Sequence, residues 1–339
     1  MRRWQQRQFG IVSGTIVLVT GLAWVSPDLA AQNSLDIDGD DIGGVVRSPS
    51  GPEAGVWVIA ETDAFDTGFH KIVVTDDAGR YVLPDLPDAT YQVWVRGYGL
   101  KDSERVTASP GVSLDLQAVE ASTPREAAQV YPANYWYSLV EVPSESEFPG
   151  TGETGNGISP NMRSQAAWID GLKQGCQLCH QLGNQATREL LNPADFDSTE
   201  AAWAHRVQVG QRGAMMSGGL RRFGENRAVA MYADWTDRIM AGEVPPTPPR
   251  PQGRERNVVL SLWEWGGETG YIHDEIATDK RDPRVNAGGP IYGVEFANDR
   301  LVWVDPVTNE ARDVHIPVRD TPGTGDFSSY ISQEMPESS

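Results

Sequence analysis

The chain has few cysteines, few histidines and a deficit of basic residues. Its 339 residues include two Cys and five His, and 28 basic residues stand against 47 acidic ones, for a net charge of −19. Nucleic acid is excluded as a partner, because binding it requires a basic face. The acidic balance is typical of a soluble exported protein, or of one that docks to a basic partner.

Several signatures of catalysis and membrane insertion are also missing. The sequence has no recognisable Ser-His-Asp set, no distinctive pair of catalytic carboxylates and no phosphate-binding glycine loop, so it indicates neither a hydrolase nor a nucleotide enzyme. After the first 31 residues no apolar run is long enough to span a membrane, and we expect no integral span in the mature chain.

Residues 1–31 have the pattern of a secretory signal. Arg2, Arg3 and Arg7 precede an uncharged, mostly apolar run from Phe9 to Val25, and cleavage after Ala31 is expected. This predicts a periplasmic or secreted protein. The run is near the short limit for a membrane span, so an uncleaved N-terminal anchor is the alternative.

The two cysteines lie in the sequence Cys176-Gln177-Leu178-Cys179-His180, which reads C-x-x-C-H, the attachment pattern of a c-type haem. Each thiol bonds one haem vinyl group, and the following imidazole becomes an axial ligand of the iron. A zinc site would need four ligands, a thioredoxin-like pair would need a flanking βαβ unit, and a disulfide here would constrain almost nothing.

Residues 161–244 read as helical around this motif, and Pro245 to Pro249 ends the last helix, which is expected from Ala228 to Met240. The order of motif, helix, methionine and final helix, with Gly183 shortly after His180, resembles a small class I cytochrome c domain. The resemblance implies one covalent haem c held by Cys176 and Cys179, with His180 as an iron ligand.

The sixth iron ligand has three candidates. Met215 and Met216 fall in a glycine-containing stretch, 213–219, which we expect to be a flexible loop before the last helix. This is where the cytochrome family places its axial methionine, and a thioether favours reduced iron. Met216 is our choice, Met215 is close behind it, and His205 on a predicted helix is the third candidate.

Residues 42–120 read as short strands joined by tight turns, after an acidic linker at 32–41. The stretch Asp36–Arg47 fails the calcium-loop pattern, because its sixth residue is Asp41 instead of Gly and its twelfth is Arg47 instead of Glu.

This part of the chain contains Gly55-Val56-Trp57-Val58, Thr75 to Leu83 and Tyr91 to Val95. In these stretches it resembles the carboxypeptidase regulatory-like family. The resemblance implies a transthyretin-like β-sandwich, a fold shared with carbohydrate-binding modules. Trp57, Trp94 and Tyr98 could stack on the sugar rings of a carbohydrate ligand, and core packing is the alternative use of these residues.

Three further segments complete the expected organisation. Residues 121–160 are predicted to be a linker, either draped over a neighbour or mobile, and residues 245–256 a Pro-rich semi-rigid linker. Residues 257–339 read as strands, and the part from Gly289 to Pro317 resembles the opening blade of a streptogramin-lyase-like β-propeller. We expect the propeller to be incomplete, because one blade leaves its faces unburied.

These observations predict a multidomain exported haem protein: an all-β sandwich, a small α-helical cytochrome c-like domain and a short β segment. The expected function is periplasmic electron transfer to an unidentified redox partner protein, with the sandwich as a docking module, more an electron carrier than an enzyme. Two alternatives stay open: a surface module that binds carbohydrate or protein, and a truncated part of a larger haem-dependent propeller enzyme.

Overall fold

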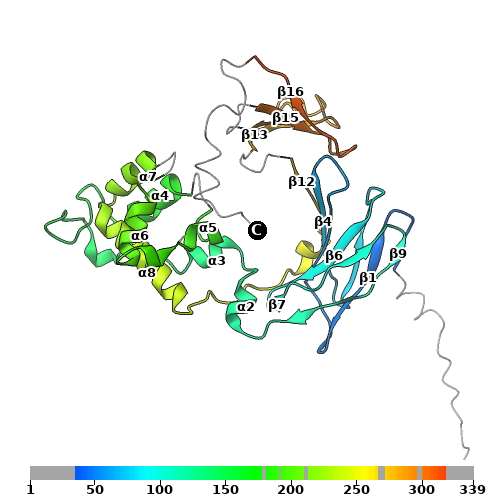
Figure 1. Cartoon of the computed structure of the whole chain (residues 1–339), viewed down its shortest axis with the longest axis horizontal. Coiled ribbons are helices and arrows are strands. Elements are labelled where there is room, and N and C mark those ends of the chain that lie inside the picture. Colours follow the sequence, from blue (N-terminus) through cyan, green and yellow to red (C-terminus); the bar gives the residue numbers. More distant parts are fainter. Residues whose placement is uncertain are drawn as a thin grey trace, which may run out of the picture. The chain divides into compact units, whose positions relative to one another are not determined.

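The computed structural model describes residues 35–177, 181–190, 192–209, 213–265, 272–295 and 300–317, without the side chains of 272–276. The expected signal segment 1–31, the motif residues Cys179 and His180, and everything after residue 317 lie outside these ranges. The described chain is of mixed type, with a β-rich N-terminal region, a helical middle and a β-rich end (Figure 1).

Two five-stranded sheets form the N-terminal region. The first contains β1 (Ile42–Ser48), β2 (Gly51–Pro52), β5 (Arg80–Leu83), β9 (Val112–Ser113) and β10 (Leu116–Gln117). The second has the order β12-β4-β3-β6-β8 and contains β3 (Trp57–Thr62), β4 (Gly68–Val74), β6 (Tyr91–Arg96), β8 (Val106–Ala108) and β12 (Leu260–Glu264). A separate pair joins β7 (Leu100–Lys101) to β11 (Val119–Glu120).

One core lies between the two sheets, because alternate residues of each strand face inward. It contains Ile42 and Val46 from β1, Leu83 from β5, and residues of the second sheet that include Val58, Phe69, Val73, Tyr91 and Val93. The predicted turn between β4 and β5 is confirmed: Asp76 Oδ1 accepts from the backbone N–H of Ala78 and of Arg80, both at 2.8 Å.

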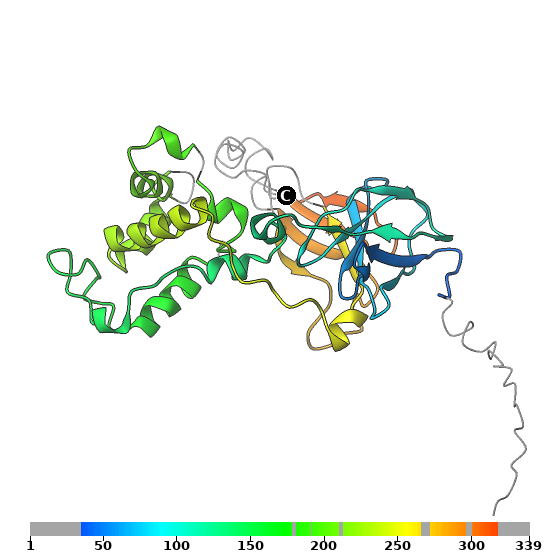
Figure 2. The same cartoon turned by 90° about the horizontal axis from the view of Figure 1, so that it is seen from below.

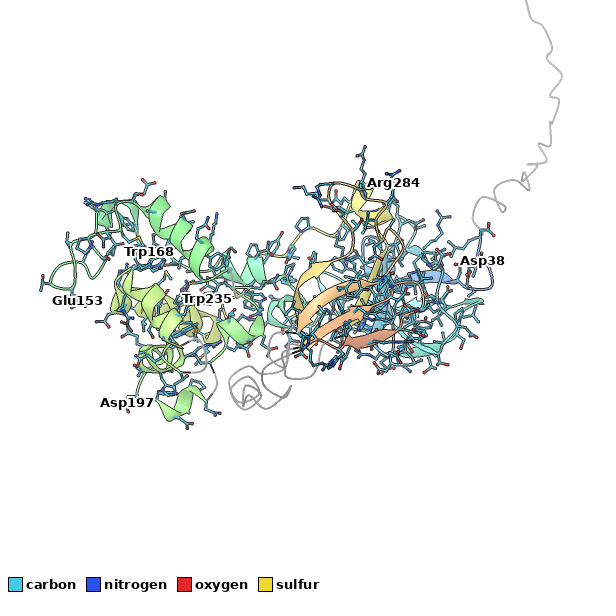
Figure 3. The ribbon with its side chains drawn as sticks, turned by 90° about the horizontal axis from the view of Figure 1, so that it is seen from above. Asp38, Glu153, Trp168, Asp197, Trp235 and Arg284 are labelled. Carbon is cyan, nitrogen blue, oxygen red and sulfur yellow. The ribbon has the colours of Figure 1, made fainter. Side chains whose placement is uncertain are left out.

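The helical middle contains α2 (Pro124–Ala128), α3 (Ala133–Tyr137), α4 (Gln165–Gly175), α5 (Gln185–Arg188), α6 (Thr199–Arg206), α7 (Gly213–Arg221) and α8 (Glu225–Met240), with 3-10 turns η1 (Glu145–Glu147) and η2 (Pro193–Asp195). α8 is the central element of this region, as the expected last helix, and its apolar face is buried: Val229, Tyr232, Trp235 and Ile239. Figure 3 labels Trp168 of α4 and Trp235 of α8, which belong to the same core. The side chain of Ser198 caps the start of α6 by accepting from Ala201 N–H.

Segment 121–160 differs from a simple linker. α2, α3 and η1 lie within it, and Ala128, Tyr131, Trp136 and Ile158 are buried in the same core as α4 and α8. The Pro143–Pro160 stretch is fixed by backbone bonds, from Gly150 N–H to Met162 O at 2.9 Å and from Ser159 N–H to Phe223 O at 2.7 Å. Of the two conformations expected for this segment, the structure has the draped one.

Between α8 and the 3-10 turn η3 (Gly253–Asn257) the chain runs without helical turns (Figure 2). Pro245, Pro248 and Pro251 are buried and the residues between them are less so, which is the three-residue period of a polyproline II segment. At its end Arg250 reaches the N-terminal region, where Nη1 donates to Glu53 Oε2 at 2.5 Å and Nε to Tyr98 O at 3.0 Å.

The C-terminal strands do not all belong together. β12 pairs antiparallel with β4 of the second sheet, with Trp263 opposite Phe69. The others form a four-stranded antiparallel meander of β13 (Ile272–Ile276), β14 (Ile291–Glu295), β15 (Arg300–Val304) and β16 (Ala311–Val314). The sequence analysis places β12 in one segment with these strands, 257–339, because hydrophobic alternation alone does not show which strands are neighbours.

Candidate functional site

Cys176 lies at the C-terminal end of α4, where its backbone N–H donates to Leu172 O at 3.0 Å. Ser164 starts this helix by accepting from Ala167 N–H at 3.1 Å, and Trp168 and Leu172 face the core from it. Cys176 is half-buried against the same core. α4 therefore delivers the first motif cysteine to the interior of the helical region.

Two tyrosines border Cys176. The Tyr232 hydroxyl of α8 donates to Cys176 Sγ at 3.7 Å. Burial raises the pKa of Tyr232 well above its usual value, and Cys176 adds to the effect. Burial, with a smaller contribution from Cys176, also raises the pKa of Tyr137 in α3. Both phenols therefore stay protonated at neutral pH and offer neutral, hydrogen-bonding neighbours to the sulfur.

Tyr232 is held by an aromatic cluster. Its ring stacks on Trp203 of α6 with centroids 4.9 Å apart. Trp203 Nε1 donates to Thr236 Oγ1 at 3.0 Å, and Trp235 Nε1 donates to Trp136 O at 3.0 Å. α3, α6 and α8 are thus joined by buried indole hydrogen bonds around the tyrosine that faces Cys176.

The chain that follows the motif packs tightly against α3. Gly183 has φ +98°, and a Cβ there would lie 2.0 Å from Ala133 O and 2.6 Å from Tyr137 N. Only glycine fits this approach. Gly183 also matches the cytochrome pattern, and the structure gives a local packing reason for a glycine at this position.

Met215 and Met216 lie on α7, not in a flexible loop. The glycines of 213–219 suggested a loop, but Gly213, Ser217 and Leu220 form the buried stripe of a helix, and Ser217 Oγ donates to Val207 O at 2.8 Å. Met215 is 60% exposed, whereas Met216 is half-buried and packs against the helical core. His205 is exposed on α6, with its ring 5.1 Å from that of Phe196.

The donor set of this region fits a c-type haem in chemical kind. It offers a half-buried thiol at Cys176, a half-buried thioether at Met216 and two buried N–H donors with no hydrogen-bond partner, Trp168 Nε1 and Arg188 Nε. Cys179 and His180 lie outside the described residues, so the structure gives the position of the first motif cysteine only. Tyr137 and Tyr232 could not be recognised as neighbours of Cys176 from the sequence, because their spacing indicates only core packing.

The aromatic residues considered for sugar stacking are engaged in packing. Trp94 is 4% exposed, with the guanidinium groups of Arg96 and Arg105 4.8 and 4.9 Å from its ring centroid. Trp57 packs edge-on against Tyr98, and Tyr98 edge-on against Tyr131. These contacts leave no row of open aromatic faces among the three.

Asp38, Asp40 and Asp41 bring their carboxylates within 4.8 Å of one another. The hydrogen bond between Asp38 and Asp40 lowers the pKa of the first and raises that of the second. The group is largely exposed and departs from the calcium-loop pattern, so we assign no ion to it.

Comparisons with known proteins add no family assignment. No protein-family model matches the chain, and no curated protein matches it significantly. Within the described ranges, no helix combines the length and the apolar character that crossing a membrane requires.

Proposed function

We propose that this chain is an exported c-type haem protein that carries electrons outside the cytoplasm. The observation that carries the proposal is the Cys176–His180 motif, whose two cysteines are the only ones in the chain. The helical surroundings of Cys176, with its tyrosine, tryptophan and thioether neighbours, support it.

In this proposal Cys176 and Cys179 bind the haem covalently and His180 ligates the iron. Met216 is the preferred second ligand because the residue is half-buried and packs against the core, with Met215 and His205 as alternatives. The bound haem supplies reversible one-electron chemistry. The protein's residues hold it, limit water and set the potential through ligand type and burial.

The neighbouring side chains have defined tasks in this proposal. Trp168, Leu172 and Trp235 are fully buried and exclude water from the interior next to Cys176. The Tyr232 hydroxyl donates to Cys176 Sγ and holds the C-terminal end of α4 against α8. A low-dielectric, water-poor surrounding favours the less charged, reduced iron and thereby raises the reduction potential.

The two N-terminal sheets with their shared core support a transthyretin-like β-sandwich, and we propose that it serves as a docking module. The strong negative charge suits a redox partner with a basic surface. The meander β13–β16 has the strand order of one propeller blade, a likeness of architecture that carries no activity.

The test is a reductive titration of the full chain, made in a host with a working haem-attachment system. The purified protein should show a haem spectrum that changes reversibly with one electron per chain. A chain that is exported and folded but takes up no haem, or whose haem cannot be cycled between two oxidation states, would reject the proposed function.

A further inference from the structure

The segment between α8 and η3 has the sequence pattern of a polyproline II ligand. Residues 245–250 read Pro-Pro-Thr-Pro-Pro-Arg, which is P-x-x-P with a basic residue two positions after the second proline. Every third residue is buried, namely Pro245, Pro248 and Pro251, and the residues between them are more exposed. A polyproline II helix has three residues per turn, so one face of the segment lies against the protein along its whole length.

The segment contacts two tyrosines that pack on each other. The Tyr131 hydroxyl donates to Thr247 Oγ1 at 3.1 Å, and Arg250 Nε donates to the backbone oxygen of Tyr98 at 3.0 Å. The rings of Tyr98 and Tyr131 meet edge-on, with centroids 5.6 Å apart. Proteins that bind Pro-rich segments typically do so with aromatic side chains, and the two tyrosines supply them here.

The N-terminal region supplies an acidic partner for the arginine of the pattern. Glu53 directly follows β2 and is 7% exposed. Arg250 Nη1 donates to Glu53 Oε2 at 2.5 Å and to Ala54 O at 3.3 Å. A buried carboxylate is costly without a cation, and here the cation belongs to a residue 197 positions later in the chain. The N-terminal region therefore contains a buried acid whose counter-charge is carried by the Pro-rich segment.

A glycine allows the segment to approach the N-terminal region closely. Gly55 has φ +67°, and a Cβ there would lie 2.8 Å from Pro251 O and 3.2 Å from Arg250 Cβ. Its N–H donates to Thr75 O at 3.2 Å, which fixes the turn before β3. A larger residue at this position would displace the segment. The surface that receives the segment is thus built from fixed backbone, so that binding costs little ordering.

We propose that Glu53, Tyr98 and Tyr131 form a binding site for proline-rich peptides of the pattern P-x-x-P-x-R, and that residues 245–251 are its internal ligand. The prolines provide a preformed polyproline II shape, and the arginine pairs with the buried acid. The inference goes beyond the proposed function and does not depend on a bound haem. Because the internal ligand is covalently attached, it competes at high effective concentration with a peptide of the same pattern from a partner protein.

The experiment measures binding of a fluorescein-labelled peptide, Pro-Pro-Thr-Pro-Pro-Arg-Pro, to the full chain by fluorescence anisotropy. Wild type is compared with the triple variant Pro245→Ala/Pro248→Ala/Arg250→Ala, which weakens the internal ligand and leaves the site itself unchanged. The triple variant should bind the peptide saturably and at least about tenfold more tightly than wild type, because the internal ligand no longer competes. Equal affinity of the two chains would contradict occupation of the site by residues 245–251.

Two exchanges test the charge pair in the triple variant. A peptide with alanine in place of arginine should bind at least about tenfold more weakly, and Glu53→Gln should weaken binding of the original peptide as much, since each removes a hydrogen bond between charged groups. Asp66→Asn is the matched control, because it removes the same charge from an exposed residue between β3 and β4 and should leave the affinity unchanged. This control separates the site from general attraction of a basic peptide to an acidic chain.

Lack of saturable binding to the folded triple variant would overturn the inference, and so would an equal loss of affinity in Glu53→Gln and Asp66→Asn. If the triple variant does not fold, Arg250→Ala takes its place, and urea unfolding is followed with and without peptide. The arginine peptide should then raise the unfolding midpoint, because a ligand of the folded state stabilises it, and the alanine peptide should not. Equal shifts with both peptides, or none with either, would reject the site. These measurements need no haem, so their failure is distinct from failure of the proposed function.

Discussion

At the scale of single residues, the candidate site separates side chains that the sequence left equivalent. Met215 and Met216 are neighbours in the chain, yet one is 60% exposed and the other packs on the core. On a helix consecutive residues point about 100° apart, so two adjacent sulfurs cannot serve one iron. The helix determines which of the two methionines faces the core. The glycines around them indicated a loop, so the helix was not predicted.

Met216→Ala should therefore change the haem spectrum and lower the reduction potential, since a soft thioether stabilises the reduced iron. The cytochrome resemblance adds the expectation that a weak far-red charge-transfer band is lost. Met215→Ala is the control and should leave both quantities unchanged. The reverse pattern would move the ligand by one residue, and no change in either variant would point to His205 or to another group.

At the scale of elements, the correct predictions are those that rest on hydrophobic periodicity. The strands between 42 and 120 and the buried face of α8 are present, because period-2 and helical spacing are local properties. α3 and α7 were missed: one lies in a segment that looked like a linker, the other is rich in glycine. Both pack with α8 in one core, which no local pattern records.

Gly183 tests the contact between the post-motif segment and α3. Gly183→Ala should lower the free energy of unfolding by about 2 kcal/mol, because it combines a positive φ with overpacking against Ala133 O. Gly219→Ala on α7 is the control, since a Cβ there meets nothing within 4 Å, and it should be neutral or gain up to about 1 kcal/mol. Urea unfolding followed by circular dichroism measures both, and equal effects would show that the close approach is absent.

At the scale of the whole described chain, distant segments complete one another's structure. β12 adds to the sheet of β4, and Arg250 forms an ion pair with Glu53, which is 7% exposed. Such long-range partners could not be predicted from one sequence. Hydrophobic alternation and charge indicate which kind of partner a residue has, but they do not identify that partner. The motif could be recognised from the sequence, since all its residues are contiguous, and its haem chemistry stays a prediction.

Arg250→Ala should reduce the free energy of unfolding by about 2 kcal/mol, the usual cost of leaving a buried charged group without its hydrogen bond. Arg281→Ala is the control: its side chain is 89% exposed and pairs with Asp279 at the surface, so no measurable change is expected. Thermal and urea unfolding of the two variants provide the comparison. A loss in Arg281→Ala equal to that in Arg250→Ala would argue against a buried pair with Glu53.

The central claim is covalent haem at the motif, and the mass of one tryptic peptide tests it most directly. Cleavage after Lys173 and Arg188 gives the peptide Gln174–Arg188, which contains Cys176, Cys179 and His180. In protein produced with a haem-attachment system, this peptide should carry the mass of one haem, and Cys176→Ser/Cys179→Ser protein should carry none. Recovery of the peptide unmodified from correctly exported, folded wild-type protein would contradict the account.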